Sequence, residues 1–475
     1  MSDSTPIPAA GCPQCAEMAK LIVELKAQVA ELRAEVRDLK ARLNTHSGNS
    51  SIPPSANPPS APKFPPKPPT GRKPGGQPGH KGHSRVRLPV ERLKDVVHHI
   101  PDACERCNAA LPKEAGVNDP KPLWHQVAEL PAVAADVTEH QGHGRRCLCG
   151  HVTWAKIPDE VRAHAFGPKL SAAVVFLSSR CHGSKRIVAE IVNTLFGVPI
   201  SVGSISNIEA EAAAVLAPAH AQAEQAVRAA AVKNADETGW SIAGKLCWLW
   251  MATTSFVACF KICAGRGAVN FRELLGENIA GIICTDRWHA YNFLELANRQ
   301  LCWAHLKRDF QKWLDRGGEG LVVGQAGLDA VKRLFELWRD FRQGKIDRPG
   351  LQAAIVPVCD QLLRALEAGG KCADKKVQRF CRNILAVYPA LWTFARIDGV
   401  EPTNNHGERT LRLAVIWRKI SFGSHSEGGC RFAERILTVV QTLRLQNRNV
   451  TTYLEHAFLA CRAGQPIPSL LPANV

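Results

Sequence analysis

The chain has no apolar run long enough to cross a membrane, since a spanning helix needs about 20 consecutive, mostly apolar residues. Its first residues also lack the apolar core of a secretory signal peptide. The 17 cysteines are an odd number, and most stand singly in apolar segments rather than in the pattern of a disulfide framework. These absences argue against a membrane protein and a disulfide-stapled secreted one. We expect a cytoplasmic protein with reduced core thiols.

Acidic residues are scarce relative to basic ones. The 475 residues carry 60 Lys and Arg against 43 Asp and Glu, a net charge of +17. Residues 61–87 contain seven basic residues and no acid, and residues 404–449 contain eight basic residues and three acids. Such clusters favour a polyanionic partner, with a solvated basic surface as the alternative. The length allows two to four domains.

The N-terminal segment 1–45 predicts a coiled coil. Between Met18 and Leu43, apolar residues alternate at spacings of four and three. The a positions hold Ile22, Val29 and Val36, and the d positions hold Leu25, Leu32 and Leu39. β-Branched a residues with leucine at d favour a parallel pair, in which Glu35 faces the partner's Lys40, so we expect a homodimer through residues 18–43. The alternative is a single helix docked on its own domain. Cys12 and Cys15 could bind metal, but one Cys-x-x-Cys is weak evidence.

Residues 46–90 predict a linker without a core. Proline pairs at 53–54, 58–59, 65–66 and 68–69 favour polyproline and coil. Within it, glycines and cations mix between Thr70 and Gly82, and the cations are Arg72, Lys73 and Lys81. The segment could follow a DNA backbone or enter a minor groove, or it could be a charged tether.

Residues 91–160 predict a zinc-binding domain. Cys104 and Cys107 form one close pair, and Cys147 and Cys149 form a tighter one. The alternating runs 123–130 and 133–137 between the pairs predict hairpin strands. Four thiolates bracketing such strands are the ligands of a structural zinc ribbon, and unliganded cysteines are the alternative.

Residues 161–225 predict a helical region with the outline of a helix-turn-helix. An amphipathic stretch, Arg186–Leu195, is broken by Gly197 and Pro199, and Ser201 is placed to cap the next helix. The second helix of such a motif enters the major groove of DNA. Ordinary helical packing explains the pattern nearly as well.

Residues 226–450 predict an α/β domain of the ribonuclease-H-like arrangement. Two strands in Val232–Thr254 turn at Gly244, and a third covers 256–263. A helix (269–277), a strand (281–285), a short helix (288–296) and a last strand (300–304) follow. A helical insertion covers about 312–400, with amphipathic stretches at 328–341, 351–366 and 377–387. Residues 451–475 are expected to form a C-terminal tail.

Three acids have positions that surface carboxylates would not need. Asp236 lies in the first strand of this domain, Asp286 closes an apolar strand, and Glu408 falls in the first turn of a predicted helix. In this order they can converge on two divalent ions about 4 Å apart, the arrangement for in-line phosphoryl transfer. Magnesium (or manganese) fits, because Mg²⁺ prefers oxygen ligands. Glu237 should point to the opposite face of the strand, so we assign it no metal.

The chain resembles the large transposase of the insertion sequence 66 family of bacteria from the coiled coil to about residue 450. The resemblance rests on ordered motifs: Asn49-Ser-Ser, Gly75-Gly-Gln-Pro-Gly-His-Lys-Gly82, Asp236-Glu-Thr, Gly265-Arg-Gly, Thr285-Asp-Arg-Trp, Cys302-Trp-Ala-His-Leu-Lys-Arg-Asp-Phe310, Pro402-Thr-Asn-Asn, Glu408-Arg and Trp417-Arg-Lys-Ile-Ser-Phe-Gly423. It implies a ribonuclease-H-like transposase that cuts at element ends and joins them to target DNA. It also implies an N-terminal zinc finger and a helix-turn-helix-like region.

Cations around the acids are candidates for DNA contacts. They are His305, Lys307 and Arg308 after the last strand, and Arg409, Arg412, Arg418 and Lys419 after Glu408. Phosphate contacts of this kind position a duplex without specifying its sequence. Trp417 could stack on a distorted base, although a core tryptophan is commoner. Accessory proteins of the same element are possible partners. A ribonuclease-H-fold nuclease that cuts without joining, and a catalytically silent DNA-binding regulator, are the alternatives.

Overall fold

The computed structural model describes residues 13–50, 86–131 and 133–472, with side chains from residue 17 onward. It divides the chain into two compact units, one spanning 62–135 and the other combining 1–61 with 136–475. The predicted DNA contacts Arg72, Lys73 and Lys81 lie outside the described residues, and so does Cys12.

A five-stranded mixed sheet forms the centre of the larger unit, in the order β5-β4-β3-β6-β7. Its strands are β3 (Val232–Ile242), β4 (Lys245–Thr253), β5 (Ala258–Cys263), β6 (Ile282–Thr285) and β7 (Arg299–Leu301). β3, β4 and β5 pair antiparallel, whereas β6 runs parallel to β3 and β7 runs parallel to β6. β-Branched and aromatic residues favour these strands, and Ala243 and Gly244, both with positive φ, form the first turn. The predicted strands are thus present.

Two details around β7 differ from expectation. The predicted short helix 288–296 is two 3₁₀ turns, η3 (His289–Tyr291) and η4 (Leu296–Asn298). β7 ends at Leu301, because helix α8 (Trp303–Arg316) begins where the strand was expected to continue. The buried Arg299 explains the first difference. Its guanidinium donates to the carbonyls of Tyr291 and Asp286, so a long-range side chain holds this loop.

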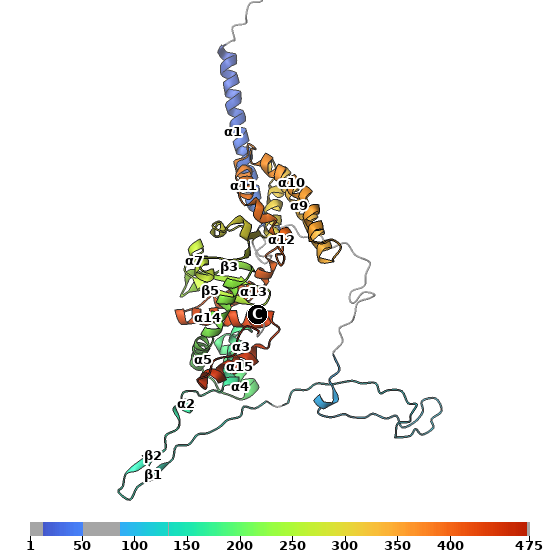
Figure 1. The fold of residues 1–475 in the computed structure, drawn as a ribbon, viewed down its shortest axis with the longest axis vertical. Helices are drawn as coiled ribbons and strands as arrows, with labels where there is room; N and C mark the ends of the chain where they lie inside the picture. Colours follow the sequence, from blue (N-terminus) through green and yellow to red (C-terminus); the bar gives the residue numbers. More distant parts are fainter. Residues whose placement is uncertain (1–12, 51–85, 132, 473–475) are drawn as a thin grey trace, which may run out of the picture. The chain divides into compact units, whose positions relative to one another are not determined.

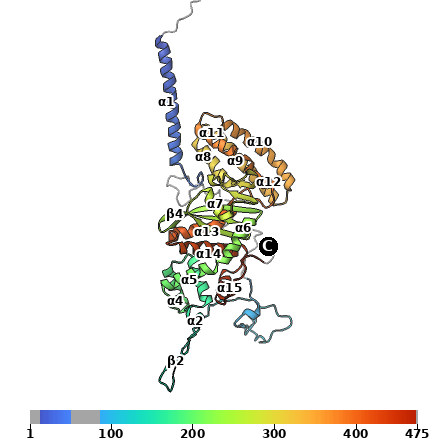
Figure 2. The ribbon, with the colours of Figure 1, turned by 60° about the vertical axis from the view of Figure 1, so that its left-hand side comes forward.

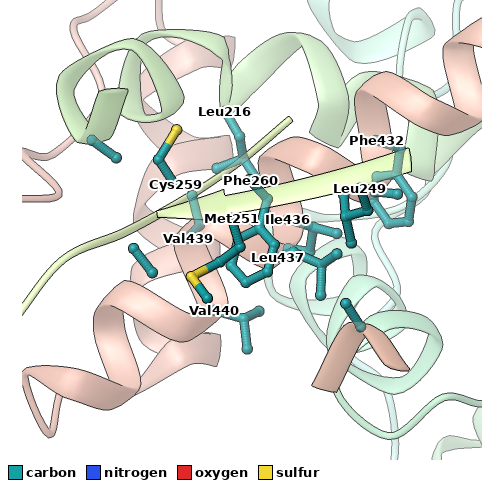
Figure 3. Packing of buried hydrophobic residues seen from close by; sticks show 14 of the residues in the cluster. Leu216, Leu249, Met251, Cys259, Phe260, Phe432, Ile436, Leu437, Val439 and Val440 are labelled. Atoms are coloured by element: carbon teal, nitrogen blue, oxygen red, sulfur yellow. The ribbon is translucent and has the colours of Figure 1, made fainter. Parts of the chain in front are cut away.

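Helix α14 (Glu427–Leu445) covers the antiparallel half of the sheet. Figure 3 shows Leu249, Met251 and Phe260 of the strands packed among Phe432, Ile436, Leu437 and Val440 of the helix. Helices α6 (Ala217–Ala229) and α7 (Ala268–Leu275) also contact β5. The resulting core is apolar and continuous with that of the preceding helices.

The outer edge of β5 is closed by side chains of α14. The backbone N–H groups of Ala258, Phe260 and Ile262 donate to Thr442 Oγ1, Thr438 Oγ1 and Glu434 Oε1, at 3.1, 3.0 and 2.5 Å. Four helical residues rise about 6 Å and two strand residues about 6.6 Å, so the two spacings match. Buried backbone donors need partners, and these side chains supply them.

The predicted helical insertion follows β7 and has its own apolar core. It comprises α8, α9 (Gly320–Arg342), α10 (Arg348–Gly369), α11 (Lys375–Leu385), η5 (Tyr388–Leu391) and α12 (Thr393–Arg396). The expected amphipathic stretches fall on α9, α10 and α11. After the insertion, α13 (Asn405–Ser421) returns to the sheet and contacts β3 (Figures 1 and 2).

The helical region before the sheet has the expected outline. Short α2 (Asp159–Arg162) precedes α3 (Pro168–Ser179), α4 (Lys185–Phe196) and α5 (Val202–Val215). Gly197 ends α4 at φ 66°, and Ser201 caps α5 by accepting from the N–H of Ser204. α5 packs into the core along Ile205, Ile208 and Ala212. The first turn of α5 is exposed, and so are Asn207, Ala210 and Ala214 on the side away from this core.

The segment expected as a C-terminal tail is instead largely a core helix. α15 (Val450–Arg462) buries Tyr453, Leu454 and Phe458 and contacts α3. Arg462 also donates to Glu211 of α5, Nε to Oε1 at 2.9 Å. A run of apolar residues at helical spacing produces this packing, so the tail prediction is wrong for residues 451–462.

The N-terminal helix α1 (Pro13–Leu43) carries the predicted apolar stripe on its surface. The stripe residues are all exposed: Met18, Ile22, Leu25, Val29, Leu32, Val36, Leu39 and Leu43. The C-terminal end of the helix contacts α8. There Asp38 accepts from Arg316, Nε to Oδ1 at 2.9 Å, and pairs with Lys376. One end is thus docked while the stripe stays uncovered.

The predicted hairpin strands between the cysteine pairs are absent from the described residues. Residues 121–131 and 133–142 form no strand, and nearly all are exposed. Without an apolar face to bury, alternation alone does not produce a sheet. The short hairpin that does form, β1 (Gly144–Arg146) with β2 (Val152–Trp154), brackets Cys147 and Cys149 instead. A 3₁₀ turn, η2 (Val90–Arg92), lies in the smaller unit.

Among the described residues, none of the helices combines the length and the apolar character that a membrane span requires.

Candidate catalytic acid site

Asp236, within β3, stands beside Asp286, which directly follows the carboxyl end of the parallel strand β6. The β3–β6 register pairs Asn234 with Cys284, so two residues further along each chain the two aspartates reach the same level. Asp286 is the first residue after β6, and its Oδ1 accepts from the N–H of Trp288 at 2.8 Å. Parallel pairing thus fixes the first two predicted acids as neighbours.

Glu408 comes to the same place on the first turn of α13. The buried Asn404 ties the start of this helix to β3. Its Nδ2 donates to Ala235 O, and its Oδ1 accepts from Asn234 Nδ2, both at 2.8 Å. Gly407 permits the close approach, because a Cβ there would meet Asn404 Oδ1 at 2.8 Å. The helix therefore begins against the strand that carries Asp236.

The three carboxylates interact electrostatically. Burial raises the pKa of Asp236 well above its usual range, and the negative charges of Glu237, Asp286 and Glu408 raise it further. The Asp236 carboxylate accepts a hydrogen bond at Oδ1 from the backbone N–H of Glu237, at 2.9 Å. One local donor does not neutralise the cluster, so it is suited to a cation.

An open cavity of about 540 Å³ gives access to this cluster. It runs between β3 and α13, and its lining includes Asp236, Glu408, Arg409 and Arg412. This arrangement suits a DNA phosphodiester. The carboxylates can hold metal ions at the reacting phosphate, and the guanidinium groups can contact the adjacent phosphates.

Glu237 has partners of its own. Its Oε1 accepts from Arg266 Nη2 at 2.7 Å, and its Oε2 accepts from the Tyr291 hydroxyl. Arg266 in turn lies over the rings of Trp248 and Trp288, 4.5 and 3.7 Å from their centroids. Burial, followed by the charge of Asp286, raises the pKa of Glu237. With both oxygens engaged, Glu237 supports the site rather than presenting free ligand atoms.

His305 lies beside Glu408. Nδ1 of His305 is 3.5 Å from Glu408 Oε1, and within the described residues neither atom has a hydrogen-bond partner. Cys302 Sγ completes a group of three ligand atoms that lie within 4.8 Å of one another. Burial and the nearby Arg308 lower the pKa of His305, so its neutral form is favoured. His305 was predicted to contact a DNA phosphate. In the structure its ring also lies next to the carboxylate of Glu408.

The other predicted DNA-contacting residues differ in how exposed their side chains are and in whether they already have partners. Arg409, Arg412, Lys419 and Lys307 are exposed. Arg418 is partly buried and donates from Nη1 to Gly239 O at 3.2 Å. Trp417 packs edge-on against Trp240 and Phe432, so it belongs to the core. Free cations therefore follow the exposed side of α13.

The two cysteine pairs fall in different units, and each forms a similar turn. In the first, Asn108 N–H donates to Cys104 O at 2.8 Å, and Asn108 has φ 57°. In the second, Gly150 N–H donates to Cys147 O at 2.9 Å, and Gly150 has φ 87°. Backbone N–H groups directed at sulfur lower the pKa of both Cys104 and Cys147. Both turns thus favour thiolates.

Two features of the site were not identified from the sequence. Asn404 was quoted within a motif without a role, and its three ties to β3 and Cys302 emerge only in the fold. The Glu237–Arg266–Tyr291 contacts also join segments distant in sequence. The only hint of these contacts in the sequence was the second acidic residue, Glu237, directly after Asp236.

Comparison with known proteins gives the following similarities. A family model described as "Transposase IS66 family" matches residues 164–432, more than half of the chain. A model of a family of unknown function matches residues 6–86. The uncharacterized protein y4qI of Sinorhizobium fredii is 29% identical over 258 residues, which cover 48% of this chain and 46% of that protein. The chain thus spans about half the length of this curated relative.

Proposed function

The chain belongs to the transposase IS66 family, and on that premise we propose that it binds the ends of an insertion sequence and cuts and joins DNA there. The proposed catalytic residues are Asp236, Asp286 and Glu408. The single observation that carries the proposal is their arrangement, one acid within β3, one directly after the parallel strand β6, and one on the first turn of the helix against them. The strand order β5-β4-β3-β6-β7 supports a ribonuclease-H-like domain.

The acid cluster fits a divalent metal. Asp236 carries a raised pKa among three other carboxylates, and the buried Oε1 of Glu408 has no donor within the described residues. Asp236, Asp286 and Glu408 would hold magnesium or manganese, with oxygen ligands throughout. When bound, such ions supply an activated water or 3′-hydroxyl and stabilise the departing oxygen.

The chain's own residues position the DNA. Arg409 and Arg412 line the cavity beside the acids and would hold phosphates next to the reacting one. Asn404 fixes the N-terminus of α13, and Trp288 N–H fixes the Asp286 carboxylate. His305 lies beside Glu408, with Nδ1 3.5 Å from Oε1, and could contact the same metal or a neighbouring phosphate. The acids are thereby held in one geometry before DNA arrives, as fast phosphoryl transfer requires.

The outlying regions supply assembly and ordering. The uncovered stripe of α1 supports a homodimer that holds two DNA ends. The two cysteine turns support one structural zinc on Cys104, Cys107, Cys147 and Cys149. DNA is the proposed partner throughout, with accessory proteins of the same element as further candidates.

One experiment tests the function. The full chain is incubated with labelled DNA from the ends of the element that encodes it and with Mg²⁺, and cleaved and joined products are mapped. Joined product supports a transposase. Cleavage without joining supports a nuclease, and binding without cleavage supports a silent regulator. Either result overturns the proposal.

A further inference from the structure

Phe422 is an exposed aromatic in a conformation that disfavours it. Its residue is 81% exposed, and among the described phenylalanines it alone is exposed. It ends α13 with φ 61° and ψ 15°, the left-handed region that normally takes glycine. An exposed aromatic ring and a left-handed backbone are both unfavourable for the fold. Their combination at one residue indicates a candidate functional position.

The turn that carries Phe422 is firmly attached to the sheet. Ser424 N–H donates to Ser241 O, and Ala243 N–H donates to Ser424 O, at 2.8 and 2.9 Å. Gly423 has φ 106°, and a Cβ there would meet Ser241 O at 2.4 Å. The ring is thus presented from a fixed point rather than from a loose loop.

Phe422 continues the face of α13 that begins at the acid site. Residues 408, 412, 415 and 419 follow at spacings of four and three, so Glu408, Arg412, Val415 and Lys419 share one face. Arg412 and Lys419 are exposed. Helical rise places Phe422 about 20 Å from Glu408, roughly six base-pair steps along a duplex. The acid, the cations and the exposed aromatic residue therefore follow one another along α13 and its C-terminal cap.

We propose that Phe422 stacks on an unpaired base of DNA held along α13. This rests on the proposed function, because it requires DNA at the acid site. The flanking cations are complementary to phosphates, and every base offers a face to an aromatic ring. Trp417, the other candidate, is partly buried and packed against Trp240 and Phe432, so it is less available to a base than Phe422.

The test uses two short DNA duplexes, one fully paired and one with a single unpaired 2-aminopurine. Their affinities for the full chain and for Phe422→Ala, Phe422→Trp and Phe422→Gly are compared. We expect the wild type to prefer the unpaired probe by about tenfold, from stacking of one base, and to quench its fluorescence. Ala and Gly should remove the preference, and Trp should keep it.

Two controls make the result specific. Lys419→Ala should weaken both probes equally, because a phosphate contact carries no base preference. Leu459→Ala, an exposed residue of α15, should change neither. Equal affinity of the wild type for both probes, or an unchanged preference in Phe422→Ala, would overturn the inference. Cleavage of end DNA by the wild type alongside either result would leave the proposed function standing, whereas absence of DNA binding would remove both.

Discussion

The acid cluster and the cysteine turns are both predicted metal sites, but the fold supports them differently. The acids stand on a sheet and a helix whose core is fully buried, with residues such as Trp250 and Phe260 at 0% exposure. The cysteine turns lie in segments 86–131 and 133–165, in which no described residue is buried. Cys107, Cys147 and Cys149 are exposed.

The difference shows what each metal would contribute. A carboxylate cluster built on a packed core keeps its geometry without the ion, so the metal adds chemistry. Thiolates on short turns without a core depend on the ion for order, so there metal binding is largely folding. Removing ligands should therefore abolish activity in one region and structure in the other.

The largest effect is expected at the acids. Asp236→Ala, Asp286→Ala and Glu408→Ala should each reduce cleavage by at least about 10²–10³-fold, the scale of losing one preorganised electrostatic group. Binding of end DNA should stay nearly intact, and so should the fold. Product mapping and a mobility-shift assay measure the two properties. Glu367→Ala, an exposed acid of α10, is the matched control. Full cleavage in any one acid variant would remove that residue from the proposed set.

The next effect concerns the cysteines. Cys104→Ser combined with Cys149→Ser should remove one zinc per full chain, measured by elemental analysis. Hydrogen exchange should then accelerate in residues 95–160 and stay unchanged in the sheet. Cys461→Ser, an exposed thiol of α15, should keep its zinc. Unchanged zinc content in the double variant would contradict the four-cysteine site.

The helix α1 extends the comparison to a region that lacks a core and needs a protein partner. Leu25→Asn with Leu32→Asn places polar groups at two d positions and should shift the full chain from dimer toward monomer. Sedimentation velocity measures the shift. Leu459→Asn is the control, because it replaces an exposed leucine on α15, outside the stripe, by the same polar residue. A monomeric wild type at high protein concentration would instead favour a single docked helix, whose end already contacts α8.

The smallest expected effect is on the free energy of unfolding. It tests whether the clustered acids destabilise the fold when no metal is bound. Burial and neighbouring charges raise the pKa of Asp236 in the fold, so its ionisation opposes folding. The opposition is absent below the ordinary pKa of 3.8 and grows as pH rises toward the folded-state pKa. At neutral pH with a chelator, Asp236→Asn should therefore be more stable than the wild type in urea unfolding, and the two should converge in acid. Asp360→Asn, exposed on α10, should show no such gain. A gain that persists unchanged in acid would argue against this cause.

Patterns within short segments predicted most of the fold. Alternation and β-branching located β3 to β6, and spacing located α9, α10 and α13. The three acids could be chosen because each lies in a recognisable strand, directly follows one, or falls in the first turn of a helix. Features held by distant side chains could not be foreseen. The 3₁₀ turn η3 is held at Tyr291 by Arg299, and the start of α13 is tied to β3 by Asn404. Residues 123–137 alternate as a strand does, yet they have no surface to pack against, which a local pattern cannot reveal.

The closure of β5 by α14 has a consequence for synthesis. Until Glu434, Thr438 and Thr442 leave the ribosome, the N–H groups of Ala258, Phe260 and Ile262 have no partner from this helix. A nascent or prematurely terminated chain ending before α14 therefore presents an open strand edge, the usual template for aggregation. Such a fragment could already contain Glu408, but it would be cleared by aggregation or proteolysis rather than accumulate as a partial enzyme.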